Sequence, residues 1–133
     1  MRSYANSFPV WLHALAASWL FSANAAACPP TGFTGIGDLP GGAVSSGVAD
    51  VSPDGMTVVG TGTSANGGEA IYWTESAGMV GLGDLPGGAF YSQGRGVSGD
   101  GSVITGYSTS GNGEREMFRW TAGGGMVGLG DLP

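Results

Sequence analysis

The chain has 133 residues, of which 28 are glycine, and it carries a formal net charge of −6. This length leaves room for one domain at most, and the acidic charge argues against binding to nucleic acid or to an anionic membrane surface. A glycine content this high is typical of low-complexity or disordered chains. Here, however, the glycines recur at fixed places among Val, Ile, Leu, Met, Phe and Trp, which disordered segments lack. We therefore expect an ordered β fold.

Residues 1–27 have the pattern of a helical signal peptide. Arg2 is the one charged side chain before a mostly apolar run, Phe8–Phe21, and Ala25, Ala26 and Ala27 supply the small residues of a cleavage site. An uncleaved anchor helix is the alternative, but a membrane span needs about 20 apolar residues. We expect cleavage and export, so that the protein is secreted or lies at the surface of a bacterial cell.

Cys28 is the only cysteine, so no disulfide can form within the chain. Because it directly follows Ala27, Cys28 is also a candidate for acylation as the first residue of a lipoprotein. A lipobox usually has Leu three residues before the cysteine, where this chain has Ala25, so the match is weak. Apart from this candidate lipid anchor we expect no membrane partner. Residues 28–36 form a short segment before the repeats.

The motif Gly-Asp-Leu-Pro-Gly-Gly at Gly37–Gly42 returns at Gly83–Gly88 and begins again at Gly130–Pro133, at spacings of 46 and 47 residues. A period of that length indicates a repeat architecture, in which each unit buries its apolar face against the next. The sequence divides into repeat unit 1 (37–82), repeat unit 2 (83–129) and the truncated start of a third unit (130–133).

Each unit contains four short apolar runs that we expect to be strands. In unit 1 these are residues 47–52, 57–63, 69–74 and 79–82. The third run alternates, with Ile71 and Trp73 opposite Tyr72, which is typical of a half-buried strand. Pro53-Asp54-Gly55 and Gly99-Asp100-Gly101 are expected to be hairpin turns, because Asp tolerates the turn conformation and Gly adopts positive φ freely.

Four antiparallel strands in about 46 residues match the size of one β-propeller blade. We therefore predict an all-β fold of antiparallel four-stranded units that resemble part of a propeller. A stacked β-solenoid is the alternative, although its units are usually shorter. Two units cannot close a ring, so we expect a truncated member or one that borrows units from another copy. Self-association through open sheet edges would follow from such an arrangement.

Three motifs of unit 2 together resemble the HAF family of bacterial extracellular repeats. They are Gly-Leu-Gly-Asp-Leu-Pro-Gly-Gly at 81–88, Gly-Val-Ser-Gly-Asp-Gly at 96–101 and Met-Phe-Arg-Trp-Thr at 117–121. The family pattern has Ala at Met117, and unit 1 departs from it at Ile36, Asp50 and Ile71. The resemblance covers about residues 34–133 and implies export and a repeat fold, without an established activity. The Ser52–Gly55 turn also looks like the hairpin of TolB-type propeller blades.

The side chains of many catalytic sites are missing from the repeats. The only histidine, His13, lies in the leader, and the chain has no lysine. This excludes Ser-His-Asp and Cys-His catalysis, imidazole metal sites and lysine bases in the exported part. No phosphate-binding loop is present either. We therefore predict no catalytic, cofactor-binding or metal-binding residues and no cofactor.

Carboxylates remain, and their placement favours structural roles. Asp54 and Asp100 occupy equivalent turns, and the same holds for Asp38, Asp84 and Asp131 in the Gly-Asp-Leu-Pro motif. Identical placement in every unit suits a turn residue better than a unique active site. A calcium site formed by Asp50, Asp54 and Glu69 is a weaker alternative, because no calcium-binding loop is present.

The aromatic residues fall into two groups. Trp73 and Trp120 could stack on sugar rings, but they share a strand face with Ile71 and Phe118, so we expect core packing. A set of other aromatic residues is expected to form an exposed surface: Tyr72, Phe90, Tyr91 and Tyr107.

We therefore predict a non-catalytic exported repeat module used for surface display or for binding to a protein or a glycan. The alternatives are a fragment of a carboxylate-dependent glycan hydrolase or lyase and a decayed remnant with no present role.

Overall fold

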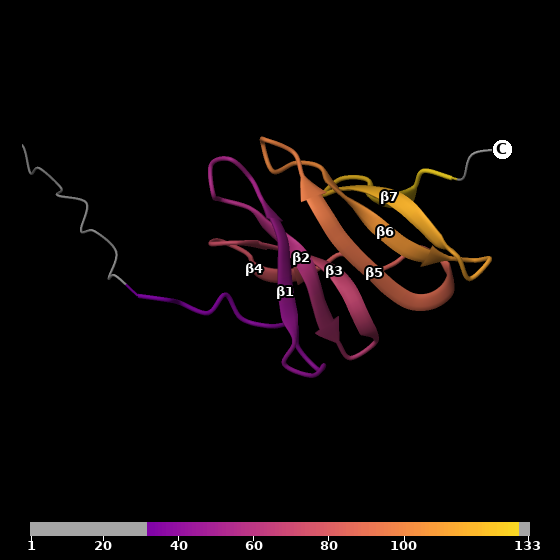
Figure 1. The fold of residues 1–133 in the computed structure, drawn as a ribbon, viewed down its shortest axis with the longest axis horizontal. Helices are drawn as coiled ribbons and strands as arrows, with labels where there is room; N and C mark the ends of the chain where they lie inside the picture. The colour runs from indigo at the N-terminus through magenta and orange to yellow at the C-terminus, as the bar shows by residue number, and fades with distance from the viewer. Residues whose placement is uncertain (1–31, 131–133) are drawn as a thin grey trace, which may run out of the picture. The chain divides into compact units, whose positions relative to one another are not determined.

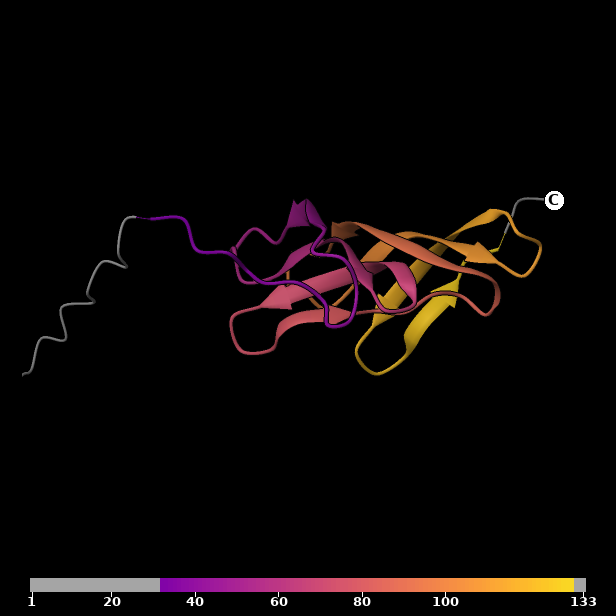
Figure 2. The same ribbon diagram turned by 90° about the horizontal axis from the view of Figure 1, so that it is seen from below.

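The computed structural model describes residues 32–130, and from Thr34 onward they form one compact unit. Every regular element in that range is a β-strand (Figures 1 and 2). Residues 32–130 contain no helix with the length and hydropathy that a membrane crossing requires. The expected signal peptide, Cys28 and Asp131 lie outside the described residues.

The strands form two four-stranded antiparallel sheets, in the orders β1-β2-β3-β4 and β5-β6-β7-β8. The first sheet consists of β1 (Ser46–Val51), β2 (Val58–Ser64), β3 (Gly67–Thr74) and β4 (Gly78–Gly81). The second consists of β5 (Gly87–Val97), β6 (Ile104–Ser110), β7 (Arg115–Thr121) and β8 (Gly125–Gly128). The four strands expected in unit 1 are confirmed, with ends that agree within two residues.

The two sheets share the bulge in their first strands, and β5 has a further register shift between Gly87 and Ser92. Each has a bulge at the same place in its first strand, between Val48 and Asp50 in β1 and between Gly94 and Gly96 in β5. The one extra residue of unit 2 lies in the turn between β6 and β7, which is longer than the turn between β2 and β3. An insertion at a hairpin tip leaves the ladder intact, because loops tolerate added length.

Turn geometry explains why so many glycines recur. Eleven glycines among residues 32–130 have positive φ. They fall into five sets of equivalent positions: Gly37, Gly83 and Gly130; Gly41 and Gly87; Gly55 and Gly101; Gly67 and Gly113; Gly78 and Gly125. In the turn that follows the first strand, φ is +74° at Gly55 and +72° at Gly101. A side chain at either position would be strained, so the predicted hairpin turns are confirmed.

The second sheet packs on the first, and β5 lies against β2 and β3 (Figure 1). The core comprises Val59 and Ala70 from the first sheet with Ile104 and Phe118 from the second, and the side chains of all four are fully buried. At the same contact the rings of Tyr72 and Trp120 lie 5.4 Å apart. Burial of this shared apolar surface holds the two units together.

The expectation that Tyr72 belongs to an exposed surface is wrong. Tyr72 is half-buried and packs against the core together with Trp120. On the opposite face of β3, Ile71 is buried close to Leu39, and both lie against Gly62. Side chains therefore cover both faces of β3, since unit 2 packs on one and the Leu of the Gly-Asp-Leu-Pro motif packs on the other.

Hydrogen bonds also join the two units. The amide of Ala70 donates to the hydroxyl of Ser92 (2.8 Å), and the amide of Val97 donates to Oδ2 of Asp50 (3.0 Å). The Ser92 hydroxyl in turn donates to the carbonyl of Gly83. The amides of Ala70 and Val97 thus have partners from the neighbouring unit, as burial requires.

Candidate functional site

The turns after β1 and β5 hold two of the candidate carboxylates in the same way. Oδ1 of Asp54 accepts from the Ser52 hydroxyl (2.6 Å) and from the Met56 amide (3.0 Å). Oδ1 of Asp100 accepts from the Ser98 hydroxyl (2.6 Å) and from the amide of Ser102 (3.0 Å), which is equivalent to Met56. Both side chains therefore form hydrogen bonds within their own turns, which confirms the predicted structural role.

These hydrogen bonds favour the ionised carboxylates. Donation from the Ser52 hydroxyl, followed by that from the Met56 amide, lowers the pKa of Asp54 below its usual value. The hydroxyl of Ser98 and the amide of Ser102 lower the pKa of Asp100 from 3.8 to about 2. Acceptance of several hydrogen bonds by the charged form is the physical cause. Neither group is suited to hold a proton for general acid catalysis near neutral pH.

The low pKa of Asp100 predicts a specific dependence of stability on pH. A carboxyl whose pKa is lower in the folded state stabilises the fold above its unfolded pKa of about 4, and this contribution is lost as the pH falls toward about 2. We expect the free energy of unfolding of Asp100→Asn to lie below that of the wild type at pH 7, with the difference closing between pH 4 and pH 2. Urea denaturation at several pH values measures this, and a difference that is constant across the range would contradict it.

Two glutamates fix the start of the Gly-Asp-Leu-Pro motif that follows each sheet. Oε2 of Glu69 accepts from the amide of Gly83 (2.9 Å), and Oε1 of Glu116 accepts from the amide of Gly130 (2.9 Å). Gly81 leaves room for the Glu69 carboxylate, because a Cβ at that position would lie 2.4 Å from Oε2. The sequence offered one signal for this role, namely the recurrence of Glu at 69 and 116 at the period of the repeat.

The residues of the calcium alternative do not form one site. Asp50 accepts from the amides of Val51 and Val97, while Asp54 and Glu69 bind the separate backbone segments described above. No group of three carboxylate, His or Cys side chains gathers anywhere in residues 32–130. Asp38 differs from the others, because its buried Oδ1 has no hydrogen-bond partner.

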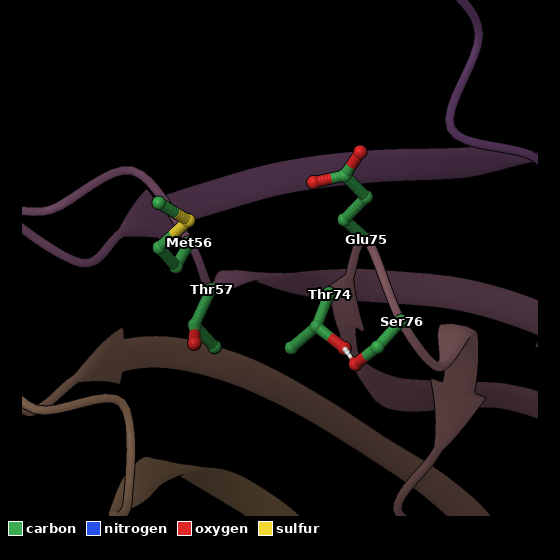
Figure 3. Close-up of a pocket in the computed structure, with 5 residues that line it drawn as sticks. All are labelled: Met56, Thr57, Thr74, Glu75 and Ser76. Atoms are coloured by element: carbon green, nitrogen blue, oxygen red, sulfur yellow. Dashed lines mark hydrogen bonds between the residues drawn. The ribbon is translucent and has the colours of Figure 1, made fainter. Parts of the chain in front are cut away.

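A cavity of about 450 Å³ lies at one end of the first sheet, lined by Met56, Thr57, Thr74, Glu75 and Ser76 (Figure 3). The hydroxyls of Thr74 and Ser76 lie 3.4 Å apart, and the Glu75 side chain extends away from them (Figure 3). Glu75 is the only carboxylate in this lining. Glycosidase chemistry needs a pair of carboxylates, so this cavity lacks the groups for that reaction.

A second cavity, of about 350 Å³, lies between the sheets beside the rings of Tyr72 and Trp120. Its aliphatic hydroxyls belong to Thr57, Thr74 and Ser102, and Tyr72 and Trp120 add a phenol and an indole N–H to the lining. Tyr72 is the only titratable side chain in the lining, so the cavity contains no acid–base pair. Trp120 packs against the core here, as the sequence predicted.

A third cavity, of about 320 Å³, lies over the second sheet beside Arg95, Tyr107 and Met117. The guanidinium carbons of Arg95 and Arg115 lie 5.4 and 4.7 Å from the centre of the Tyr107 ring. A hydrogen bond from Arg95, together with the charges of Arg115 and Arg95, lowers the pKa of Tyr107 below its usual value. This is the one site among the described residues where cationic side chains converge, and no motif in the sequence marks it.

Comparison with family models, with curated proteins and with solved structures gives no match to this chain. The resemblance to HAF repeats thus rests on the three motifs alone.

Proposed function

We propose that the chain is a non-catalytic exported module of HAF-type repeats that binds a glycan or a protein at or outside the bacterial cell surface. The strongest support is that equivalent carboxylates make equivalent backbone hydrogen bonds in both units. Asp54 and Asp100 bind equivalent turn amides, and Glu69 and Glu116 bind equivalent motif amides. An active site needs a constellation that occurs once, whereas these groups serve the same structural need in each unit.

We further propose that the two sheets are blades of a propeller-like assembly. Each sheet is a simple antiparallel meander, and the second packs face to face on the first. The chain passes directly from β4 to the next sheet, where the amide of Leu85 donates to the Ser108 hydroxyl (2.9 Å). The edge strands β1, β4, β5 and β8 each have one pairing partner, which supports association with further units through their open edges.

The proposal is tested by a hydrolysis and lyase screen of the full chain on a panel of polysaccharides. We expect binding without turnover, and we expect binding to persist in the Asp54→Asn and Asp100→Asn variants. Turnover that disappears in either variant, while circular dichroism shows an intact fold, would instead identify a carboxylate-dependent enzyme.

A further inference from the structure

The outward face of the second sheet gathers all the cationic side chains of residues 32–130. Tyr107 pairs with Met117 and Thr105 pairs with Arg119 across β6 and β7, so these side chains share one face. Arg115 lies on the same face of β7, over the Tyr107 ring. Phe118, between Met117 and Arg119, faces the core. We name the set Arg95, Tyr107, Arg115, Met117 and Arg119 the arginine face.

The arginine face is exposed, and its hydrogen bonds do not neutralise its charge. The three arginines are all exposed. Arg95 donates to Oε1 of Gln93 (2.8 Å) and to the hydroxyl of Tyr107 (3.2 Å), which are both uncharged acceptors. Glu116 is next to Arg115 in sequence, but it lies on the opposite face of the strand, where its carboxylate accepts a hydrogen bond from the amide of Gly130. The face thus has a positive potential on a chain whose formal net charge is −6.

This face is not a copy of the surface on which unit 2 packs. In unit 1 that surface carries Val59, Ala70 and Tyr72, and the equivalent positions in unit 2 are Thr105, Met117 and Arg119. Where unit 1 has a largely apolar surface, unit 2 therefore has a polar threonine, a flexible methionine and a cationic arginine.

A second copy of unit 1 does not fit the arginine face in the manner of the internal contact. The internal contact needs Gly94, because a Cβ there would lie 2.6 Å from Cγ1 of Val59 and 2.8 Å from the carbonyl oxygen of Gly60. The position equivalent to Gly94 in unit 1 is Val48. Val48 would meet the backbone of Gly106, the residue of β6 equivalent to Gly60. A ligand other than a second copy of unit 1 is therefore favoured.

The chemistry of the face favours an acidic polysaccharide over an acidic peptide. The backbone groups of β6 and β7 already pair within the sheet, so a peptide lying on this face would bury amides without partners, which is costly. Leu129 lines the third cavity together with Met117, and the two side chains are 57% and 64% exposed. Sugar hydroxyls can remain solvated at this open surface while the rings cover both side chains. Guanidinium groups match carboxylates in bidentate geometry.

We propose that the arginine face binds a polysaccharide that carries carboxylates on its sugar rings, a uronan. This inference rests on the proposed binding function and names its ligand class. Arg115 and Arg119 are four residues apart on β7, which corresponds to about 13 Å along a strand. The face therefore contacts charges on more than one sugar of a polymer, and a single small anion does not span it.

The test measures binding of the full chain to polygalacturonate by isothermal titration calorimetry, with the fully methyl-esterified polymer as the matched ligand without charge. We expect binding to polygalacturonate that weakens as the salt concentration rises and is lost with the esterified polymer. Arg119→Gln should weaken binding about fivefold to tenfold, since a charge-assisted hydrogen bond is lost. Ala77→Asp, in the exposed turn after β3, changes the net charge by the same amount and should leave binding within about twofold.

Several results would overturn the inference. These are equal binding to the esterified polymer, an unchanged affinity in Arg119→Gln, and the absence of binding to polygalacturonate. Tighter binding to a sulfated polysaccharide, or to polyglutamate, would also reject a uronan as the ligand. Circular dichroism confirms the fold of each variant. Failure here is distinct from failure of the proposed function, which is read from turnover in the Asp54→Asn and Asp100→Asn variants.

Discussion

Replacement of Phe118 by Ala is expected to lower the free energy of unfolding by about 3–5 kcal/mol, the range measured for large-to-small changes at buried aromatic residues. Phe118 is fully buried at the contact between the two sheets. Its ring lies over Gly106, where a Cβ would come within 2.9 Å of Cζ. A glycine has no side chain that can move into the cavity, so the site cannot relax easily. Chemical denaturation in urea measures the change.

Met117→Ala is the matched control for Phe118→Ala, because Met117 is the preceding residue of β7 and is 64% exposed. We expect its effect to stay within about 0.5 kcal/mol, as for most surface substitutions. Equal effects of the two substitutions would show that the two faces of β7 are covered to the same extent, contrary to the structure described above.

Gly94→Ala is expected to lower the free energy of unfolding. Overpacking of a well-packed core typically costs about 1–3 kcal/mol, and we expect an effect at least as large here. The added methyl group would lie 2.6 Å from Cγ1 of Val59 and 2.8 Å from the carbonyl oxygen of Gly60. The carbonyl oxygen belongs to a paired strand and cannot move aside as a flexible side chain would. The β5 strand would therefore have to move away from the first sheet. Thermal and urea denaturation of the purified variant measure this.

Gly99→Ala provides the control for Gly94→Ala, because a Cβ at Gly99 has open space around it. The same chemical change there should leave stability unchanged or slightly raised, since alanine reduces the entropy of the unfolded chain. If Gly94→Ala were tolerated as well as Gly99→Ala, close contact between β5 and the first sheet would be refuted.

The strands and turns could be predicted because their signals are local. The alternation of Ile71, Tyr72 and Trp73 indicates a strand, and Asp and Gly at 54–55 and 100–101 indicate hairpin turns. The structural role of Asp54 and Asp100 was also predictable, because repetition at one period indicates a common local need. The structure adds which donors they bind, and these are the serine two residues before and the amide two residues after.

The remaining features depend on which face of one sheet meets the other, and this is not encoded locally. The alternation in β3 predicts that Tyr72 is solvent-exposed, yet unit 2 covers that face of the strand. Likewise, Arg95 and Arg115 are 20 positions apart in sequence. Both lie over the Tyr107 ring, and Arg95 is the bulged residue of β5 beside strand β6. The role of Glu69 depends on Gly83, 14 residues away, which turns back over its carboxylate.

The packing of the two equivalent sheets is tested most directly by nuclear Overhauser effects between the rings of Tyr72 and Trp120 in the isotopically labelled full chain. The ring centres lie 5.4 Å apart across the contact, so we expect cross-peaks between their aromatic protons. Two folded sheets whose Tyr72 and Trp120 rings show no such cross-peaks would contradict the packing on which the fold, the core and the exposure of the arginine face all depend.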